Sequence, residues 1–289
     1  NKIAIFEGLN KFILPMANIY KVLVPHDFSE VADTAISHAA TVAKSFGGEI
    51  VLLHVISSEK ARSEAETKLK QLAENASNTY SVPVSFEIRK GSIFDRIPEV
   101  GDEIGAMLVV MGTHGKRGMQ KITGSWALKI ISNSKVPFLV VQEKTVPKSV
   151  ENIVFPIDMQ KESKEKLKIT AYYAKVLNAK VHIFVRKSND KFLLGQINAN
   201  VLSAKKFFNS NDVRYDITVD KENDFVEDLI NYTVKSDSDV IAIVNMNYKN
   251  FTNIFGNREE DLLFNEARVP VLIMTPNMDH MYTTVLQNF

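Results

Sequence analysis

Hydrophobic residues follow two alternating patterns along the first half of the chain. Short runs rich in β-branched residues predict strands near 20–25, 50–56, 84–89, 106–111 and 137–142. Segments with apolar residues at 3.6-residue spacing predict helices near 29–46, 59–80, 93–104 and 124–134. The first helix should end at Gly47-Gly48. Strands such as Met107–Met111 are apolar on both faces, which is typical of a parallel sheet covered by helices on each side. The pattern predicts an open, doubly wound α/β sheet.

The same pattern returns about 130 residues later, with five segments echoed in the same order. The echoed pairs are Lys21–Asp27 with Asn152–Asp158, Val51–Ser57 with Val181–Lys187, Ser85–Lys90 with Tyr215–Asp220, Met107–Gly112 with Val240–Asn245, and Val136–Val141 with Val269–Met274. We therefore predict two tandem homologous domains, 18–144 and 150–277, joined near 143–149. An N-terminal arm of 1–17, with no expected ligand role, and a C-terminal tail of 278–289 flank them.

Composition removes several classes of function. The 289 residues carry 35 Lys and Arg against 34 Asp and Glu, so the overall charge does not favour nucleic acid or an anionic membrane as a partner. The chain has no cysteine, which excludes disulfides, thiol nucleophiles and thiolate metal sites. No apolar run approaches the roughly 20 residues that span a bilayer. A cytoplasmic location fits these features.

Residues suited to ligand binding follow three strands of the first half. Asp27 follows the first strand, His54 and Val55 close the second, and a turn with four glycines follows the fourth. Carboxyl ends of parallel strands meet at one edge of a sheet, where ligands bind at the point of strand-order reversal. Glycines let the backbone come close to a phosphate, and a helix N-terminus offers free N–H groups. The turn contains Gly112, Gly115, Gly118 and Gly124, with Ser125 following, and Lys116, Arg117 and Lys121 make it basic.

Each of these residues also has a structural interpretation. The glycine turn can be a tight strand–helix connection, and Asp27 can order the loop before the first helix. Ser29 is better explained as a helix N-cap than as a ligand, and Trp126 as helix packing. Lys116 and Arg117 can belong to a solvated loop. A metal site of His26, His54 and His114 is conceivable by count, but no i, i+4 pair supports it, and we predict no metal.

The segments PHDFS, LLHV and GTHG…GS together resemble the universal stress protein family. This resemblance implies a Rossmann-like five-stranded domain, similar to adenine nucleotide alpha hydrolases, that binds ATP or AMP, with or without Mg²⁺, in a stress response. It implies Asp27 on the adenine side, backbone groups of Val55 at the base, Gly112 and Gly115 at ribose and phosphate, and Gly124 with Ser125 at the phosphates. The full implied set is Pro25, Asp27, Val55, Met111, Gly112, His114, Gly115, Lys116, Arg117, Gly124, Ser125 and Trp126.

Two departures from the family pattern matter. Eight residues separate Gly115 from Gly124, where the family pattern has nine, so the loop either absorbs the difference or misaligns Ser125. The second copy keeps Asp158 but has Tyr248 where the first has Gly115, and Arg258 falls near the place of Ser125. We predict that this second copy does not bind ATP in the family manner.

No Walker A sequence and no convincing catalytic set occur in the chain. We therefore predict a regulatory nucleotide-binding protein rather than an enzyme, in which any slow ATP turnover would be incidental. The alternatives are a nucleotide-free interaction module and an adenylate-forming ligase, although the Ser-Gly-Gly-x-Asp signature of the latter is missing.

The apolar fifth strands, 136–141 and 269–274, are candidate edges that pair with one another. In single-domain relatives this strand commonly builds the dimer. The sequence thus suggests an intrachain pseudo-dimer in which the second copy replaces a partner subunit. A homodimer of the whole chain is the alternative that the sequence also allows.

Overall fold

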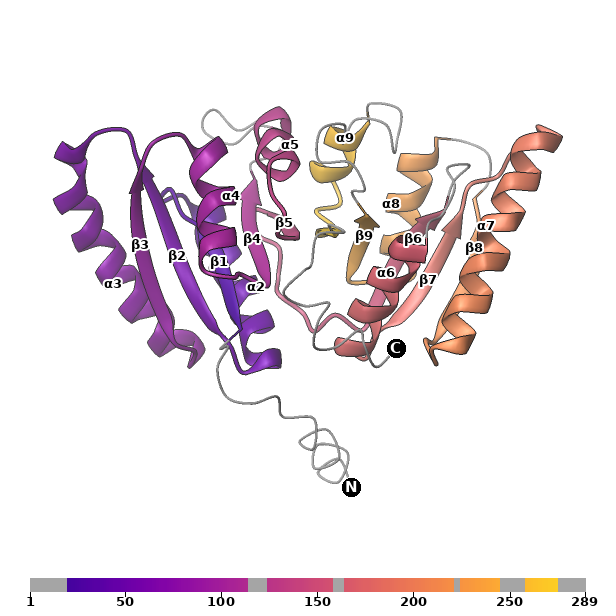
Figure 1. The fold of residues 1–289 in the computed structure, drawn as a ribbon, viewed down its shortest axis with the longest axis horizontal. Coiled ribbons are helices and arrows are strands. Elements are labelled where there is room, and N and C mark those ends of the chain that lie inside the picture. Colours follow the sequence, from indigo (N-terminus) through magenta and orange to yellow (C-terminus); the bar gives the residue numbers. More distant parts are fainter. Residues whose placement is uncertain (1–19, 114–123, 158–163, 221–223, 245–257, 275–289) are drawn as a thin grey trace, which may run out of the picture.

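The computed structural model describes residues 20–113, 124–157, 164–220, 224–244 and 258–274. Its strands form one ten-stranded sheet in the order β3-β2-β1-β4-β5-β10-β9-β6-β7-β8 (Figure 1). The strands are β1 (Lys21–Pro25), β2 (Glu49–Ile56), β3 (Val84–Lys90), β4 (Leu108–Thr113), β5 (Phe138–Gln142), β6 (Asn152–Ile157), β7 (Lys180–Val185), β8 (Tyr215–Val219), β9 (Val240–Val244) and β10 (Val271–Met274).

The helices lie between these strands. They are α2 (Glu30–Phe46), η2 (Glu59–Ala61), α3 (Arg62–Tyr80), α4 (Ile93–Glu103), α5 (Gly124–Ser132), α6 (Lys164–Val176), α7 (Lys191–Ser210), α8 (Phe225–Lys235) and α9 (Glu259–Leu263). The predicted alternation of strands and helices is confirmed, and α2 ends at Gly47, whose φ of 63° is left-handed. The predicted helix over 59–80 opens with the short 3-10 turn η2 instead of α-helix.

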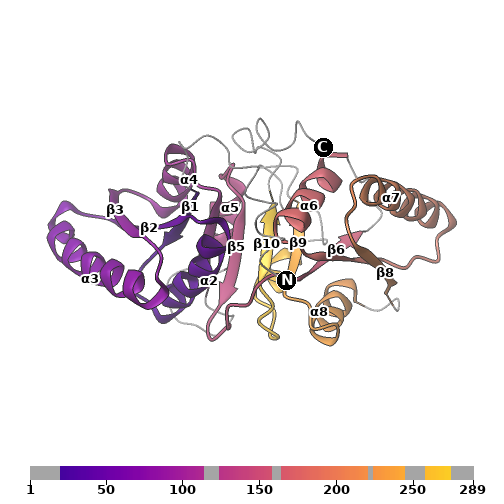
Figure 2. The same ribbon diagram turned by 90° about the horizontal axis from the view of Figure 1, so that it is seen from below.

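Strand order is the same in the two halves of the sheet. β1 lies between β2 and β4, and β6 lies between β7 and β9, with every one of these neighbours parallel. β5 and β10 lie side by side at the centre and are antiparallel, with Leu139 opposite Leu272 (Figure 2). These two strands are the segments that the sequence marked as fifth strands, and here they join the halves into one sheet.

Helices cover both faces of the sheet, as expected for strands that are apolar on both sides. One buried cluster takes its helical residues from α2, α3, α6 and α7, and includes Leu139 and Leu272. The other takes them from α4, α5, α8 and α9, and includes Phe138 and Ile273. Because each cluster contains residues of both β5 and β10, the core runs without a break across the junction.

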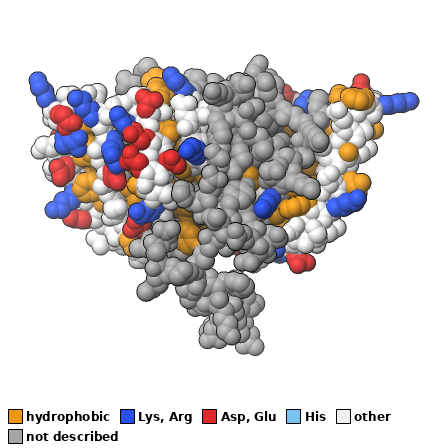
Figure 3. Space-filling view, viewed as in Figure 1, with side chains coloured by type: hydrophobic (Ala, Val, Ile, Leu, Met, Phe, Trp, Pro, Cys, Tyr) orange, Lys and Arg blue, Asp and Glu red, His pale blue; other side chains and the backbone are white. Residues whose placement is uncertain are grey.

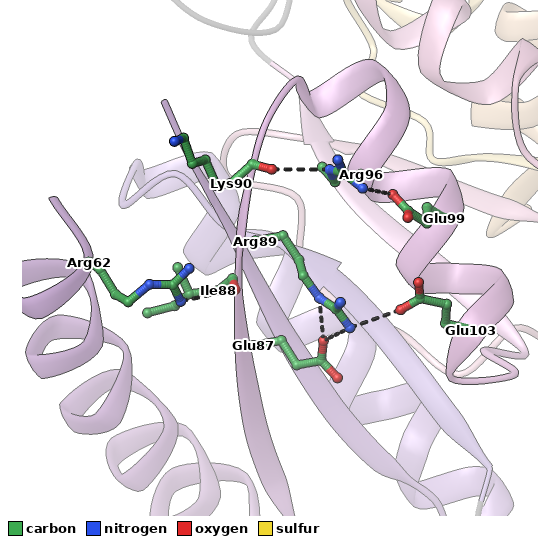
Figure 4. A network of polar contacts seen from close by, with 8 residues as sticks. All are labelled: Arg62, Glu87, Ile88, Arg89, Lys90, Arg96, Glu99 and Glu103. Carbon is green, nitrogen blue, oxygen red and sulfur yellow. Dashed lines mark hydrogen bonds and ion pairs between the residues drawn. The ribbon is translucent and has the colours of Figure 1, made fainter. Parts of the chain in front are cut away.

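A polar network protects the outer edge of the sheet at β3 (Figure 4). Arg62 Nη1 donates to the carbonyl oxygen of Ile88 at 3.3 Å, and Arg96 Nε donates to that of Lys90 at 3.1 Å. Arg89 Nη2 bonds Glu87 at 2.7 Å and Glu103 at 2.9 Å. Side-chain donors thus occupy backbone acceptors that would otherwise template a further strand.

Charges of both signs are intermixed over the first half on the face shown in Figure 3. Among the described residues, no helix combines the length and apolar character needed to cross a membrane.

Candidate functional site

A small cavity lies where strand order reverses in the first half. It has a volume of about 60 Å³ and is formed by the ends of β1 and β2, the start of α2, the first turns of α4, and Gly112 of β4. The sheet therefore brings together four residues that the sequence proposed for binding, namely Pro25, Asp27, Val55 and Gly112. This is the position at which open α/β sheets bind ligands.

Gly112 lies inside β4, paired with Val141, and not in the turn where the sequence placed it. A Cβ atom at this position would lie 2.4 Å from the carbonyl oxygen of Val31. Glycine is therefore required because the first turn of α2 packs directly against β4. This packing role explains the residue type at 112 without a ligand.

Asp27 orders the loop between β1 and α2. Its Oδ1 accepts hydrogen bonds from the backbone N–H of Ser29, at 3.1 Å, and from the Ser29 hydroxyl. This is the structural interpretation of Asp27 that the sequence left open. Ser29 occupies the N-cap position of α2, as predicted, although its side chain bonds Asp27 and not a helix amide.

His26 is buried and has both ring nitrogens engaged. Nδ1 accepts from the Phe28 N–H at 3.1 Å, so Nε2 carries the proton and donates to Asp33 Oδ1 at 3.1 Å. Burial lowers the pKa of His26, and the nearby Asp33 carboxylate opposes that shift. The His54 ring donates from Nδ1 to the His26 carbonyl oxygen at 2.7 Å. Both histidines thus build the loop, and no three-residue metal-binding cluster occurs in the described ranges.

Phe28 is a feature of this loop that the sequence analysis missed. Its φ of 64° is left-handed, which is unusual for a bulky residue. The ring lies 4.6 Å from the His54 ring and 5.7 Å from the His26 ring, with the Lys68 ammonium 5.5 Å from its centre. Nothing in the local sequence pattern indicates a left-handed aromatic residue, and the contact with the His54 ring joins residues far apart in the chain.

Two further predicted residues lie beside this cavity without lining it. Met111 is fully buried in β4, so only its backbone could meet a ligand. Trp126 lies near the start of α5, is 45% exposed and packs edge-on against Phe94 at 5.6 Å. This contact agrees with the prediction that Trp126 serves helix packing.

The predicted phosphate loop falls largely outside the described residues, including His114, Gly115, Lys116 and Arg117. Gly124 and Ser125 form the beginning of α5. In the second half, Asp158 and Tyr248 also lie outside them. Arg258 is described, and its guanidinium pairs with Asp224 and Asp261, the latter at 2.8 Å. Two carboxylates therefore compensate the cation that falls near the place of Ser125.

Comparison with known proteins places this geometry in a family. The model of the universal stress protein family matches residues 18–142. A universal stress protein of Methanocaldococcus jannaschii is 31% identical over 153 residues, covering 47% of this chain and 89% of the relative. Universal stress protein G of Salmonella typhimurium is 30% identical over 144 residues, covering 43% of this chain and 100% of the relative.

A solved structure extends the likeness in fold beyond the first half. The crystal structure of a universal stress protein from Archaeoglobus fulgidus matches 89% of this chain and 98% of its own, with a TM-score of 0.67 and 16% identity. At that identity the match describes the fold alone. Together with the sequence matches over the first half, the strand order and the cavity at its reversal point, these likenesses identify the chain as a member of the universal stress protein family.

Proposed function

We propose that this protein is a regulatory, non-catalytic binding protein that holds an adenine nucleotide, ATP or AMP, in its first half. The observation that carries the proposal is the cavity at the strand-order reversal, lined by Asp27, Val55 and Gly112. Its volume of about 60 Å³ suits part of a ligand, since whole ligand pockets measure roughly 300–1,000 Å³. The base lies at this cavity, and the phosphates extend toward the loop at 114–123 and the start of α5.

The chemistry of the strand ends suits this pose. A carboxylate has about four lone-pair sites, which suits the Asp27 side chain as an acceptor for the adenine amino group. The start of α5 offers backbone N–H groups to a phosphate, and Lys116 and Arg117 add positive charge. The sequence shows no catalytic set, so in this proposal the protein acts by binding the nucleotide and not by converting it.

We propose that the second half is a degenerate copy of the same domain that serves as a built-in partner for the first. The matching strand order and the antiparallel β5–β10 contact support this idea. The ion pairs of Arg258 with Asp224 and Asp261 support the loss of phosphate binding, because they compensate the nearest cation.

A nucleotide-free interaction module of the same fold is the second candidate. Two observations favour it, since Asp27 bonds Ser29 and Gly112 is required by Val31, so neither residue needs a ligand to explain it. The two candidates differ in whether nucleotide accompanies the protein.

The decisive experiment identifies nucleotide released on denaturing protein that was purified without added ligand. The matched variant is Gly115→Tyr, which imitates Tyr248 of the second half. We expect ATP or AMP from the wild type and little from the variant. Equal release from both would mean that the loop is assigned wrongly, and failure of the wild type to bind added ATP in calorimetry would favour the interaction module.

Asp27→Asn tests the base-binding end of the site. Asparagine keeps an oxygen that can accept from the Ser29 N–H but removes the negative charge. We expect about a tenfold loss of ATP affinity, in line with hydrogen bonds to charged groups, with an unchanged melting temperature. Ser29→Ala, which leaves the carboxylate in place, should bind ATP within about twofold of the wild type. Equal affinities for wild type and Asp27→Asn in calorimetry would remove Asp27 from the site.

A further inference from the structure

A second and much larger cavity lies at the junction of the two halves, on the sheet face that α2 and α6 flank. Its volume is about 770 Å³. The walls come from the end of α2, the segment 144–151 that connects β5 to β6, the end of α6, and residues preceding β7, β8, β9 and β10. On the opposite face α5 and α9 contact each other over the junction. Of the residues that the structure describes, the lining of this cavity shares none with the cavity at Asp27.

Positive charge dominates the walls of this junction cavity. Among the described residues that line it, five side chains are cationic and two are carboxylates. The cations are Lys144, Lys148, Lys180, Arg214 and Arg268, and the carboxylates are Glu151 and Asp239. Asp239 Oδ2 is already engaged by the backbone N–H groups of Glu151 and Asn152, at 2.8 and 2.9 Å. Lys148 and Lys180 have carboxylate partners outside the lining, Asp237 and Asp216. Among the described residues of the lining, Lys144, Arg214 and Arg268 therefore remain against Glu151 and Asp239, a small excess of positive charge.

Lys144 and Arg268 differ from the other cations of the lining in their position beside the β5–β10 contact. Antiparallel pairing puts the end of β5 beside the beginning of β10, and Gln142 Nε2 donates to the Asn265 carbonyl oxygen there at 2.9 Å. Lys144 follows β5 and Arg268 precedes β10, both with left-handed φ values, 61° and 56°. Neither forms an ion pair with any residue of the described ranges. Two cations without an ion-pair partner among the described residues therefore line the cavity from the adjacent ends of β5 and β10.

The rest of the lining is substantially apolar. Leu139, Val240 and Val269 are buried beneath it, and Val42 and Leu177 contribute partly buried side chains. The volume of about 770 Å³ lies within the roughly 300–1,000 Å³ of small-molecule sites. A ligand that fits both kinds of wall has an apolar body and an anionic end.

We propose that the junction cavity binds an amphipathic organic anion, with its apolar body over Leu139 and Val269 and its carboxylate, phosphate or sulfonate at Lys144 and Arg268. The site requires both halves and the segment that joins them, so it exists only in the paired chain. This inference goes beyond the nucleotide site and does not depend on it.

The test uses 8-anilinonaphthalene-1-sulfonate, a fluorescent aromatic sulfonate, titrated into the full chain. The variants are Lys144→Asn/Arg268→Asn, which removes both charges, and Lys144→Asp/Arg268→Asp, which reverses them. Asn and Asp tolerate left-handed φ, so the backbone of both positions is kept. We expect affinity to fall about threefold in the first double variant and about tenfold in the second, from the loss and then reversal of two charge contacts.

Controls separate this site from other binding surfaces. Lys205→Asp/Lys206→Asp makes the same charge change on an exposed stretch of α7 and should leave affinity unchanged. Titration in saturating ATP, and of Asp27→Asn, should also give the wild-type affinity, because these act on the other cavity. Equal loss in the Asn and Asp variants, equal loss in the α7 control, or displacement of the probe by ATP would each overturn the proposal. Melting curves verify that every variant is folded.

Discussion

Single residues at the carboxyl ends of β1 and β4 have neighbours that decide their roles. The sequence identified Asp27 and Gly112 as candidates because both follow or end a predicted strand. Their contacts with Ser29 and Val31 depend on how α2 packs, and no local pattern reveals them. Phe28 shows the same limit, since its ring packs near two histidine rings, one just after β1 and the other in β2.

Replacing Gly112 with alanine tests the packing role. The added methyl group would meet the Val31 carbonyl oxygen at 2.4 Å, so α2 or β4 must shift. We expect a loss of about 1–3 kcal/mol in the free energy of unfolding, the usual cost of overpacking, measured by urea denaturation.

Gly195→Ala is the matched control for this substitution. A Cβ at Gly195, inside α7, meets nothing within 4 Å. Alanine there should leave the free energy of unfolding equal to that of the wild type or raise it by up to about 1 kcal/mol, because alanine favours helix. Similar effects of the two substitutions would contradict the packing explanation of Gly112.

At the scale of elements, a partly buried hydrogen bond joins α2 to the segment after β5. His38 Nε2 lies 3.0 Å from Thr145 Oγ1, and the Thr145 hydroxyl donates to the Gln142 carbonyl oxygen at 2.8 Å. The threonine oxygen therefore accepts from a neutral His38. Burial lowers the pKa of His38 to about 4, from the ordinary 6.5, and the hydrogen bond with Thr145 partly opposes this shift.

The lowered pKa of His38 predicts acid sensitivity. Between pH 6.5 and about 4 the unfolded chain binds a proton at His38 that the folded chain does not, so stability falls as the pH falls. The contribution amounts to about 3 kcal/mol over that range. In urea denaturation across this window, His38→Gln should lose this part of the pH dependence.

Thr145→Val controls for the hydrogen bond alone. This variant keeps the titratable ring and should therefore keep the pH dependence, although its stability at neutral pH is lower. Parallel stability curves for the wild type and His38→Gln would show that His38 does not titrate as described.

For the whole molecule, the β5–β10 contact determines whether the halves behave as one body. Leu139 pairs with Val110 on one side and Leu272 on the other, so β5 is a central strand of the ten-stranded sheet. The junction cavity and both core clusters include residues of each half. Separation of the halves would therefore expose core and remove the proposed anion site together.

Leu139→Pro and Leu272→Pro test this contact. Proline removes a backbone donor and is poorly tolerated in central strands. We expect each variant to lower the free energy of unfolding by about 3 kcal/mol or more and to enlarge the molecule in small-angle scattering.

Val219→Pro, in the edge strand β8, is the control for proline itself. The next residue, Asp220, donates its N–H to Val185 of β7, so the N–H of Val219 faces away from the sheet. Val219→Pro should therefore change the free energy of unfolding only slightly. Unchanged compactness and stability in the two leucine variants would show that the β5–β10 contact does not hold the halves together.

Local patterns along the chain were enough to locate the elements. Apolar spacing predicted the strands and helices of the first half to within about two residues, apart from the start of α3, because side chains recur every two residues along a strand and every 3.6 along a helix. The internal repeat indicated that this order occurs twice, and Gly47 marked the end of α2.

Contacts between distant residues were decided only by the folded chain. Three features join residues far apart in sequence: the register of Leu139 against Leu272, the Val31 carbonyl that requires Gly112, and the lining of one cavity by both Lys144 and Arg268. Such contacts depend on the packing of whole helices against a twisted sheet, and periodicity along the chain carries no information about which side chains that packing brings together.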